Sequence, residues 1–182
     1  MFKDNLANKI IKKISSKEIF SCKWYKLKHD KLILPNGKKG DYFYIHKKGC
    51  VMIIAIENNN IILTEQYRYL SKKNSIELPA GGFDNGNPKF HAQREFEEET
   101  GYRAKYWKKI GIFYPYNGIS NEICHVFLAK NLIKTKVNPD ETEFIKIIKK
   151  PVKEVYKMAE QNKITDGMTI SALFLAKKYL KI

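Results

Sequence analysis

Four carboxylates stand within five positions of this chain, inside segment 94–101. If that segment is helical, Glu95, Glu98 and Glu99 project from one side, because they are three and four residues apart. Glu97 points elsewhere. Like charges so placed repel by roughly a few tenths of a kcal/mol per pair. A hard divalent cation such as Mg²⁺ binds carboxylate oxygens and would reverse that repulsion. The spacing therefore indicates a metal site, with a solvated helix face as the alternative.

The residues around the carboxylates must hold them in place. Segment 78–88 is rich in glycine, proline and asparagine, which predicts a turn-rich loop. Asn87 suits the N-cap of a helix and Pro88 its first position. Gly101 suits the residue that ends it. We therefore predict a loop followed by a helix of about three turns that begins at Pro88.

The remainder of the chain is basic. Its 182 residues include 34 lysines and arginines against 19 acidic residues, a formal net charge of +15. Only three of the basic residues are arginines (Arg68, Arg94 and Arg103), whereas proteins that read nucleic acids rely on arginine forks. We expect the charge to attract an anionic small-molecule substrate, and we expect no specific nucleic-acid partner.

The sequence also bears on compartment. No apolar run approaches the ~18 residues that span a bilayer, and the N-terminus lacks the apolar segment of a secretory signal. Cys22, Cys50 and Cys124 are scattered without metal-ligand spacing, which favours free thiols over disulfides or a zinc site. We therefore expect a cytoplasmic protein with no membrane partner.

Hydrophobic patterning predicts a mixed α/β fold. Residues 5–14 predict a short basic helix or a loose arm, and residues 18–45 a β-hairpin or meander around a turn at 35–37. Strands and helices mix without a repeating βαβ period, which favours a sandwich with a mixed sheet between helices. Strands are predicted at 51–56 (buried and central), 61–67, 107–114, 122–129 and 144–149, and helices at 152–162 and 165–179.

The carboxylate segment resembles the second half of the signature box of the Nudix hydrolases. The matching residues are Arg94, Glu95, Phe96, Glu98, Glu99, Gly101 and Tyr102, with Gly81 as the opening glycine. The family's first box glutamate falls on Asn87, and six residues separate Asn87 from Arg94 where the family has one more. In the family that glutamate braces the loop and the arginine, while the metal ligands lie in the second half of the box. The resemblance therefore implies that the departure changes loop geometry and catalytic efficiency more than metal binding.

Four further segments resemble the ADP-ribose pyrophosphatase branch of that family: 65–69, 76–82, 117–122 and 164–170. The resemblance implies an α/β/α sandwich, with the Nudix domain in 48–182. It also implies that residues 1–47 form N-terminal strands that join a homodimer and contact the substrate base. A proline that the branch usually carries is replaced by Asn117, so another nucleotide sugar or a dinucleoside polyphosphate stays open as the substrate.

The resemblance implies a role for each site residue. The metal, Mg²⁺ or alternatively Mn²⁺, would be bound by Ala80, Gly81, Glu95, Glu98, Glu99 and Glu143. The catalytic residues would be Glu141, Glu98 and Arg94, with Glu141 or a box carboxylate as the base. The substrate would be bound by Trp24, Arg68, Gly118 and Glu122. The alternatives are core or interface packing for Trp24, a surface strand residue at Arg68 and a polar turn at 140–143.

Together these expectations describe Mg²⁺-dependent hydrolysis of a nucleoside diphosphate linked to a sugar, with ADP-ribose giving AMP and ribose 5-phosphate. Two rival classes stay open. One is a Nudix-like module that binds a nucleotide without cleaving it, suggested by the missing first glutamate. The other is an RNA-end processing enzyme, which rests on net charge alone.

Overall fold

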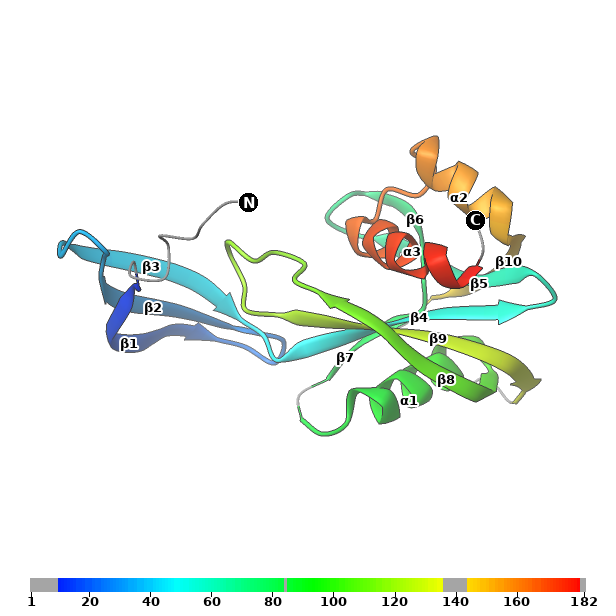
Figure 1. Ribbon diagram of the computed structural model, residues 1–182, viewed down its shortest axis with the longest axis horizontal. Coiled ribbons are helices and arrows are strands. Elements are labelled where there is room, and N and C mark those ends of the chain that lie inside the picture. The colour runs from blue at the N-terminus through cyan, green and yellow to red at the C-terminus, as the bar shows by residue number, and fades with distance from the viewer. Residues whose placement is uncertain (1–9, 84, 136–143, 181–182) are drawn as a thin grey trace. The chain divides into compact units, whose positions relative to one another are not determined.

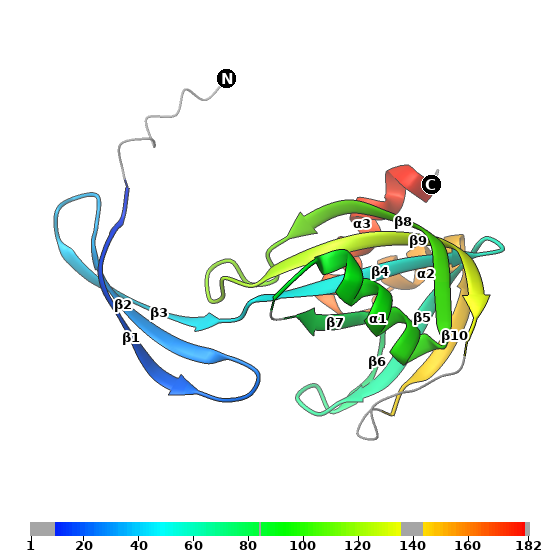
Figure 2. The ribbon, with the colours of Figure 1, turned by 90° about the horizontal axis from the view of Figure 1, so that it is seen from below.

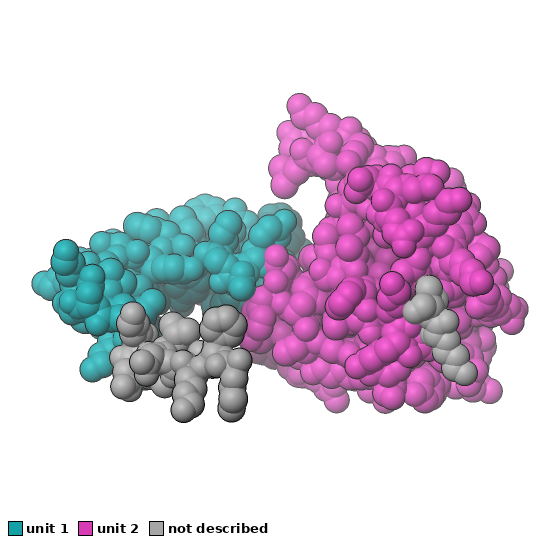
Figure 3. Space-filling model, turned by 45° about the horizontal axis from the view of Figure 1, so that its top comes forward, with its two compact units in different colours: residues 1–47, 116–122 teal, residues 48–115, 123–182 magenta. Residues whose placement is uncertain are grey.

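The computed structural model describes residues 10–83, 85–135 and 144–180. The chain divides into two compact units (Figure 3). The first unit comprises residues 1–47 and 116–122, and the second comprises residues 48–115 and 123–182. The loop 116–122 thus joins the N-terminal strands, although it is distant from them in sequence. Ile45 N–H donates to the carbonyl of Ile119 over 2.8 Å and secures that loop.

The first unit is built on a three-stranded antiparallel sheet of β1 (Lys12–Ser21), β2 (Lys26–Ile33) and β3 (Lys39–His46) (Figure 1). Gly37 turns the chain between β2 and β3 at a φ of 80°, a conformation that suits glycine. The predicted meander is therefore confirmed. The predicted helix or loose arm is wrong for residues 12–14, because β1 pairs with β2 there. The rest of that prediction up to residue 9 lies outside the described residues.

A seven-stranded mixed sheet forms the centre of the second unit, with β10, β5, β4, β9 and β8 in that order. Strand β6 pairs with β5, and β7 with β4. The β4–β9 pair is parallel and its neighbours are antiparallel. The strand bounds are β4 (Gly49–Glu57), β5 (Asn60–Arg68), β6 (Lys73–Glu77), β7 (Ala80–Phe83), β8 (Tyr102–Phe113), β9 (Ile123–Lys134) and β10 (Lys146–Pro151).

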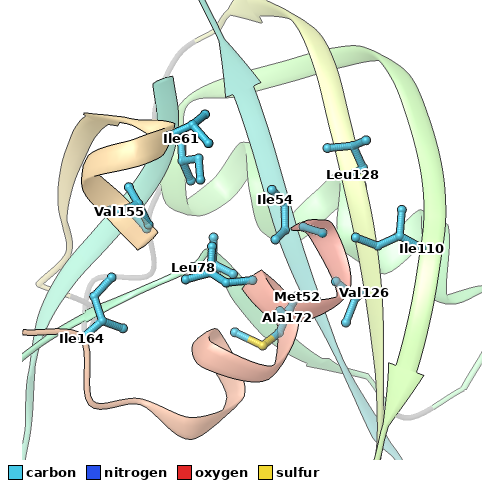
Figure 4. Close-up of a cluster of buried hydrophobic side chains, with 14 of the residues drawn as sticks. Met52, Ile54, Ile61, Leu78, Ile110, Val126, Leu128, Val155, Ile164 and Ala172 are labelled. Atoms are coloured by element: carbon cyan, nitrogen blue, oxygen red, sulfur yellow. The ribbon is translucent and has the colours of Figure 1, made fainter. Parts of the chain in front are cut away.

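Helices cover both faces of this sheet, as Figure 2 shows from below. Helix α1 (Pro88–Thr100) packs on one face, and α2 (Val152–Glu160) and α3 (Gly167–Leu180) pack on the other. Strand β4 explains the continuous apolar run: Val51 and Ile53 face the α1 side, while Met52 and Ile54 face α2 and α3 (Figure 4). The predicted α/β/α sandwich is therefore confirmed. None of the described helices is long and apolar enough to cross a membrane.

The segment predicted as a glycine loop is partly a strand. Residues 80–83 form β7 and pair antiparallel with residues 49–52 of β4. Glycines weaken a strand by themselves, so the edge of β4 supplies what the local sequence lacks. No bounds were predicted for strand β6, which ends shortly before this segment. The loop prediction was therefore wrong for 80–83. Pairing with β4 fixes the β7 backbone, which lies beside the carboxylates of α1.

Candidate active site

Helix α1 begins and ends where its sequence predicts. The Asn87 side chain accepts a hydrogen bond from the N–H of Lys89 over 2.9 Å, and Pro88 occupies the first turn. Gly101 ends the helix at a φ of 66°, with its N–H donating to the carbonyl of Glu97 over 2.8 Å. Such an N-cap stabilises a helix by about 1 kcal/mol. Asn87 therefore caps the helix at the position where the box has its first glutamate.

Two of the predicted metal ligands rest directly on β7. Glu99 is 7% exposed, and its Oε2 accepts a hydrogen bond from the N–H of Ala80 over 3.2 Å. The Glu95 carboxylate lies over Gly81 so closely that a Cβ on that glycine would stand 2.3 Å from Glu95 Cδ. Only glycine leaves room for this approach. The structure thus brings together four of the predicted ligand residues.

Arg94 links the remaining carboxylate to the group. Its Nη2 lies 2.5 Å from Oε1 of Glu95, and its Nη1 lies 3.6 Å from Oε2 of Glu98. The guanidinium therefore offsets the repulsion between these two carboxylates. Glu97 points away from them and accepts a hydrogen bond from Arg103 Nε over 2.6 Å, as the spacing predicts. The three carboxylates and one arginine form a polar cluster at the β7 side of α1.

The cluster has hard oxygen donors suited to Mg²⁺ or Mn²⁺. In the described parts of the chain, no three acidic, histidine or cysteine side chains converge closely enough to hold a metal ion. Glu95 and Glu98 instead contact Arg94. Binding of a cation by all three carboxylates therefore requires the Glu98 side chain to turn from the guanidinium toward Glu95, which already lies over Gly81. Glu98 has room to turn, since its side chain is 41% exposed.

Arg68, a predicted substrate residue, is held by a partner that the sequence did not reveal. Its Nε donates to Oε1 of Glu77 over 2.8 Å and its Nη2 donates to Oε2, a bidentate pair. The hydrogen bonds that Arg68 donates to Glu77 raise the pKa of Arg68, and the charges of Asp166 and Glu99 act in the same direction. The Arg68 side chain is half exposed, whereas Glu77 is buried. Arg68 is therefore partly exposed on its strand, as the alternative expected, but it also forms an ion pair with a buried carboxylate.

A second contact that the sequence did not reveal fixes residues 78–79, which connect β6 to β7. Thr169, fully buried at the start of α3, accepts a hydrogen bond from the N–H of Leu78 over 3.0 Å. Asp166 Oδ2 in turn accepts from the N–H of Thr169 over 2.7 Å. The carbonyl of Pro79 accepts from Ile53 over 2.9 Å. These bonds tie the backbone that leads to Ala80 to both α3 and β4.

The other predicted substrate residues belong to the first unit. Trp24 is 72% exposed, so the core-packing alternative is wrong within this chain. The carbonyl of Gly118 accepts a hydrogen bond from the hydroxyl of Tyr42 over 2.7 Å. Glu122 is buried and pairs with Lys47 over 2.9 Å. Glu141 and Glu143 lie outside the described residues, so their roles stay predictions.

Family comparison decides what kind of protein carries this cluster. A model of the NUDIX domain matches residues 46–168, well over half of the chain. The chain belongs to the Nudix hydrolase family. A second model, the nucleoside diphosphate sugar hydrolase N-terminal domain, matches residues 11–45. Nudix hydrolases generally use divalent metal cations, in keeping with the oxygen donors on α1.

Individual relatives span nearly the whole chain. It is 36% identical over 166 residues to the ADP-ribose pyrophosphatase of Bacillus subtilis (strain 168), covering 89% of this Nudix protein and 90% of the relative. It is 35% identical to the methanol dehydrogenase activator of Bacillus methanolicus, covering 94% and 92%. A crystal structure of an ADP compounds hydrolase superposes with a TM-score of 0.85 at 20% identity, covering 94% of each chain. That likeness shows the fold.

Proposed function

We propose that this Nudix hydrolase cleaves the pyrophosphate bond of a nucleoside diphosphate linked to a sugar. ADP-ribose is the first candidate substrate, with AMP and ribose 5-phosphate as products. The names of the relatives support this choice, since one is an ADP-ribose pyrophosphatase and others are GDP-mannose pyrophosphatases. The observation that carries the proposal is the contact of Glu95 and Glu99 with β7 at Gly81 and Ala80.

The proposed cation is Mg²⁺, with Mn²⁺ as the alternative. Its ligands would be the carboxylates of Glu95, Glu98 and Glu99, the backbone at Ala80 and Gly81, and Glu143. When bound, the cation would neutralise pyrophosphate charge and lower the pKa of a bound water. Arg94 would keep the carboxylates oriented while the cation is absent, because it already contacts two of them.

The protein's own groups would then complete the reaction. Glu98 is the more exposed box carboxylate and can take a proton from water. Glu141 is the other candidate base. Arg68 would bind a phosphate oxygen through the N–H groups that Glu77 does not use, because a guanidinium has five donors. Because Glu77 fixes the Arg68 guanidinium at β5, its N–H donors are already oriented before the phosphate binds.

We also propose that residues 1–47 serve a homodimer and the substrate base. Ile19, Phe20, Trp24 and Phe43 are exposed in the first unit, an apolar surface that a second subunit would cover. Trp24 is available to stack on a base, and Gly118 and Glu122 are the other proposed contacts. We place the protein in the cytoplasm, which its three free cysteines support.

A substrate panel tests this function. Purified protein with Mg²⁺ would be incubated with ADP-ribose, GDP-mannose and a dinucleoside polyphosphate, and the nucleoside monophosphate released would be measured. We expect release of AMP from ADP-ribose, abolished by EDTA. A faster reaction with GDP-mannose would shift the substrate to another nucleotide sugar, which Asn117 keeps open. Absence of monophosphate from every compound would refute hydrolysis and favour a binding module.

A further inference from the structure

A pocket of about 400 Å³ lies between α1 and β8, both in the second unit. Its walls include Phe90, Arg94 and Glu97 from the helix and Arg103 and Trp107 from the strand. Ligand pockets in proteins commonly have volumes of roughly 300–1,000 Å³, and their walls are mostly apolar with a few polar groups. This lining has that character.

The pocket lies on a different side of α1 from the metal cluster. Phe90, Arg94 and Glu97 recur at intervals of four and three residues, so they share one helical face. The candidate metal ligands Glu95 and Glu99 point instead toward β7. Arg94 stands at the border between the two faces, since it lines the pocket and also contacts Glu95 and Glu98.

The charges of the pocket favour an anion. The chain has only three arginines among 34 basic residues, and two of them line this pocket. Arg103 donates from Nε to Glu97 over 2.6 Å, and its terminal nitrogens form no other hydrogen bond within the described residues. A guanidinium fork matches the oxygens of a phosphate group and binds it through two parallel hydrogen bonds.

The aromatic side chains favour a planar ring. Two kinds of contact fix Trp107 in place. Its Nε1 donates to the carbonyl of Ala104 over 2.9 Å. Its ring packs edge-on against Phe96 and Phe127, with ring centroids 6.0 and 6.4 Å apart. A ring so held presents a rigid apolar wall to the pocket. Phe90, which is 64% exposed, supplies a second aromatic surface. Aromatic surfaces pack against planar rings in offset-stacked or edge-to-face arrangements.

We propose that this pocket binds a nucleoside monophosphate. The phosphate contacts Arg103 and Arg94, and the base packs against Trp107 and Phe90. This is a second site, separate from the one proposed for pyrophosphate cleavage, and it does not depend on that cleavage taking place. Because the phosphate shares Arg94 with Glu95 and Glu98, an occupied pocket changes how firmly the arginine holds these carboxylates.

The chain offers a direct optical test, because Trp24 and Trp107 are its only tryptophans. In a Trp24→Phe variant of the full chain, fluorescence reports on Trp107 alone. AMP is titrated with EDTA present, which removes metal-dependent binding at the other site. We expect saturable quenching, with binding weakened about tenfold by Arg103→Gln, the loss expected for one charge-assisted contact. Lys105→Gln, an equal charge change on the same strand, is the matched control.

Several results would overturn the proposal. Absence of quenching at millimolar AMP would do so, as would equal affinities of the Arg103→Gln and Lys105→Gln variants. Inorganic phosphate or adenosine binding as tightly as AMP would also refute a nucleoside monophosphate as ligand. Phe90→Ala gives a second check, since Phe90 is exposed and its removal leaves the core intact; its affinity for AMP is expected to fall. Hydrolysis of ADP-ribose is measured separately with Mg²⁺, so either proposal can fail alone.

Discussion

The main-chain N–H of Ala80 donates a hydrogen bond to the buried carboxylate of Glu99 over 3.2 Å. This bond joins two segments nineteen residues apart and links the last turn of α1 to the first residue of β7. A carboxylate removed from water is costly unless its oxygens are satisfied. The bond therefore helps to fix the orientation of Glu99, a candidate metal ligand.

Replacement of that carboxylate tests the metal site. Glu99→Gln keeps the volume of the side chain but removes its negative charge. Changing groups that only support metal ligands costs about 10- to 100-fold, so we expect the loss of a ligand itself to lower kcat/KM by at least about 100-fold. The measurement is AMP release from ADP-ribose at saturating and limiting Mg²⁺. Glu160→Gln on the exposed end of α2 is the control and should keep activity within about twofold of the unchanged protein.

A pair of glycine substitutions tests the approach of Glu95 to β7. In Gly81→Ala the new Cβ would stand 2.3 Å from Glu95 Cδ, so the carboxylate must move away. In Gly82→Ala the closest atom, the carbonyl oxygen of Gly49, stands 3.9 Å away, which is an ordinary contact. We expect Gly81→Ala to lose activity by about tenfold or more. Gly82→Ala should retain it.

Thermal unfolding distinguishes an effect on the site from an effect on the fold. The Glu95 side chain is partly exposed and flexible, so Gly81→Ala is expected to shift the Tm only slightly. Similar activities of the two alanine variants would contradict the importance of this contact. A large drop in Tm for Gly81→Ala alone would mean that β7 rather than the carboxylate had been disturbed.

The parts of this site that the sequence predicted are those specified by local signals. Asn87, Pro88 and Gly101 define the ends of α1 through bonds within a few residues, and the helical period then separates Glu97 from the other carboxylates. Strand β7 depends on pairing with β4, about thirty residues earlier in the chain, and glycines at 81 and 82 give no local sign of it. Non-local pairing therefore explains that error.

Burial was the other quantity that the sequence left open. Glu77 is an acidic residue, a type that favours the surface, yet it is only 6% exposed. Its burial is tolerated because Arg68 donates a hydrogen bond to each of its two carboxylate oxygens. The rarity of arginine in this lysine-rich chain was the available signal that Arg68 has a particular partner. Trp24 shows the opposite departure: it is a large aromatic residue, whose type favours burial, yet it is exposed.

The ion pair between half-exposed Arg68 and buried Glu77 predicts non-additive stability changes. Arg68→Gln leaves the Glu77 carboxylate without its partner, and a buried charged group so left costs about 1–3 kcal/mol. We expect that loss in the free energy of unfolding by urea. In the double variant with Glu77→Gln, two neutral amides face each other, and part of the loss should be recovered. Additive losses in the two single variants would contradict coupling.

A last prediction concerns pH. Burial lowers the pKa of His125 from its ordinary value of 6.5, and the charge of Lys109 adds to this effect. Its Nδ1 is buried and has no hydrogen-bond partner among the described residues, so nothing there stabilises the protonated ring. The unfolded chain therefore binds this proton more readily than the folded chain.

The folded state is thus favoured while the ring is neutral, above the ordinary pKa. That contribution is lost as the pH falls from above 6.5 through the lower pKa of the folded state. We expect the free energy of unfolding by urea to decrease between pH 7.5 and pH 5, and His125→Gln to show a smaller decrease over the same range. An identical pH dependence in the two proteins would mean that another group, and not His125, takes up the proton on unfolding.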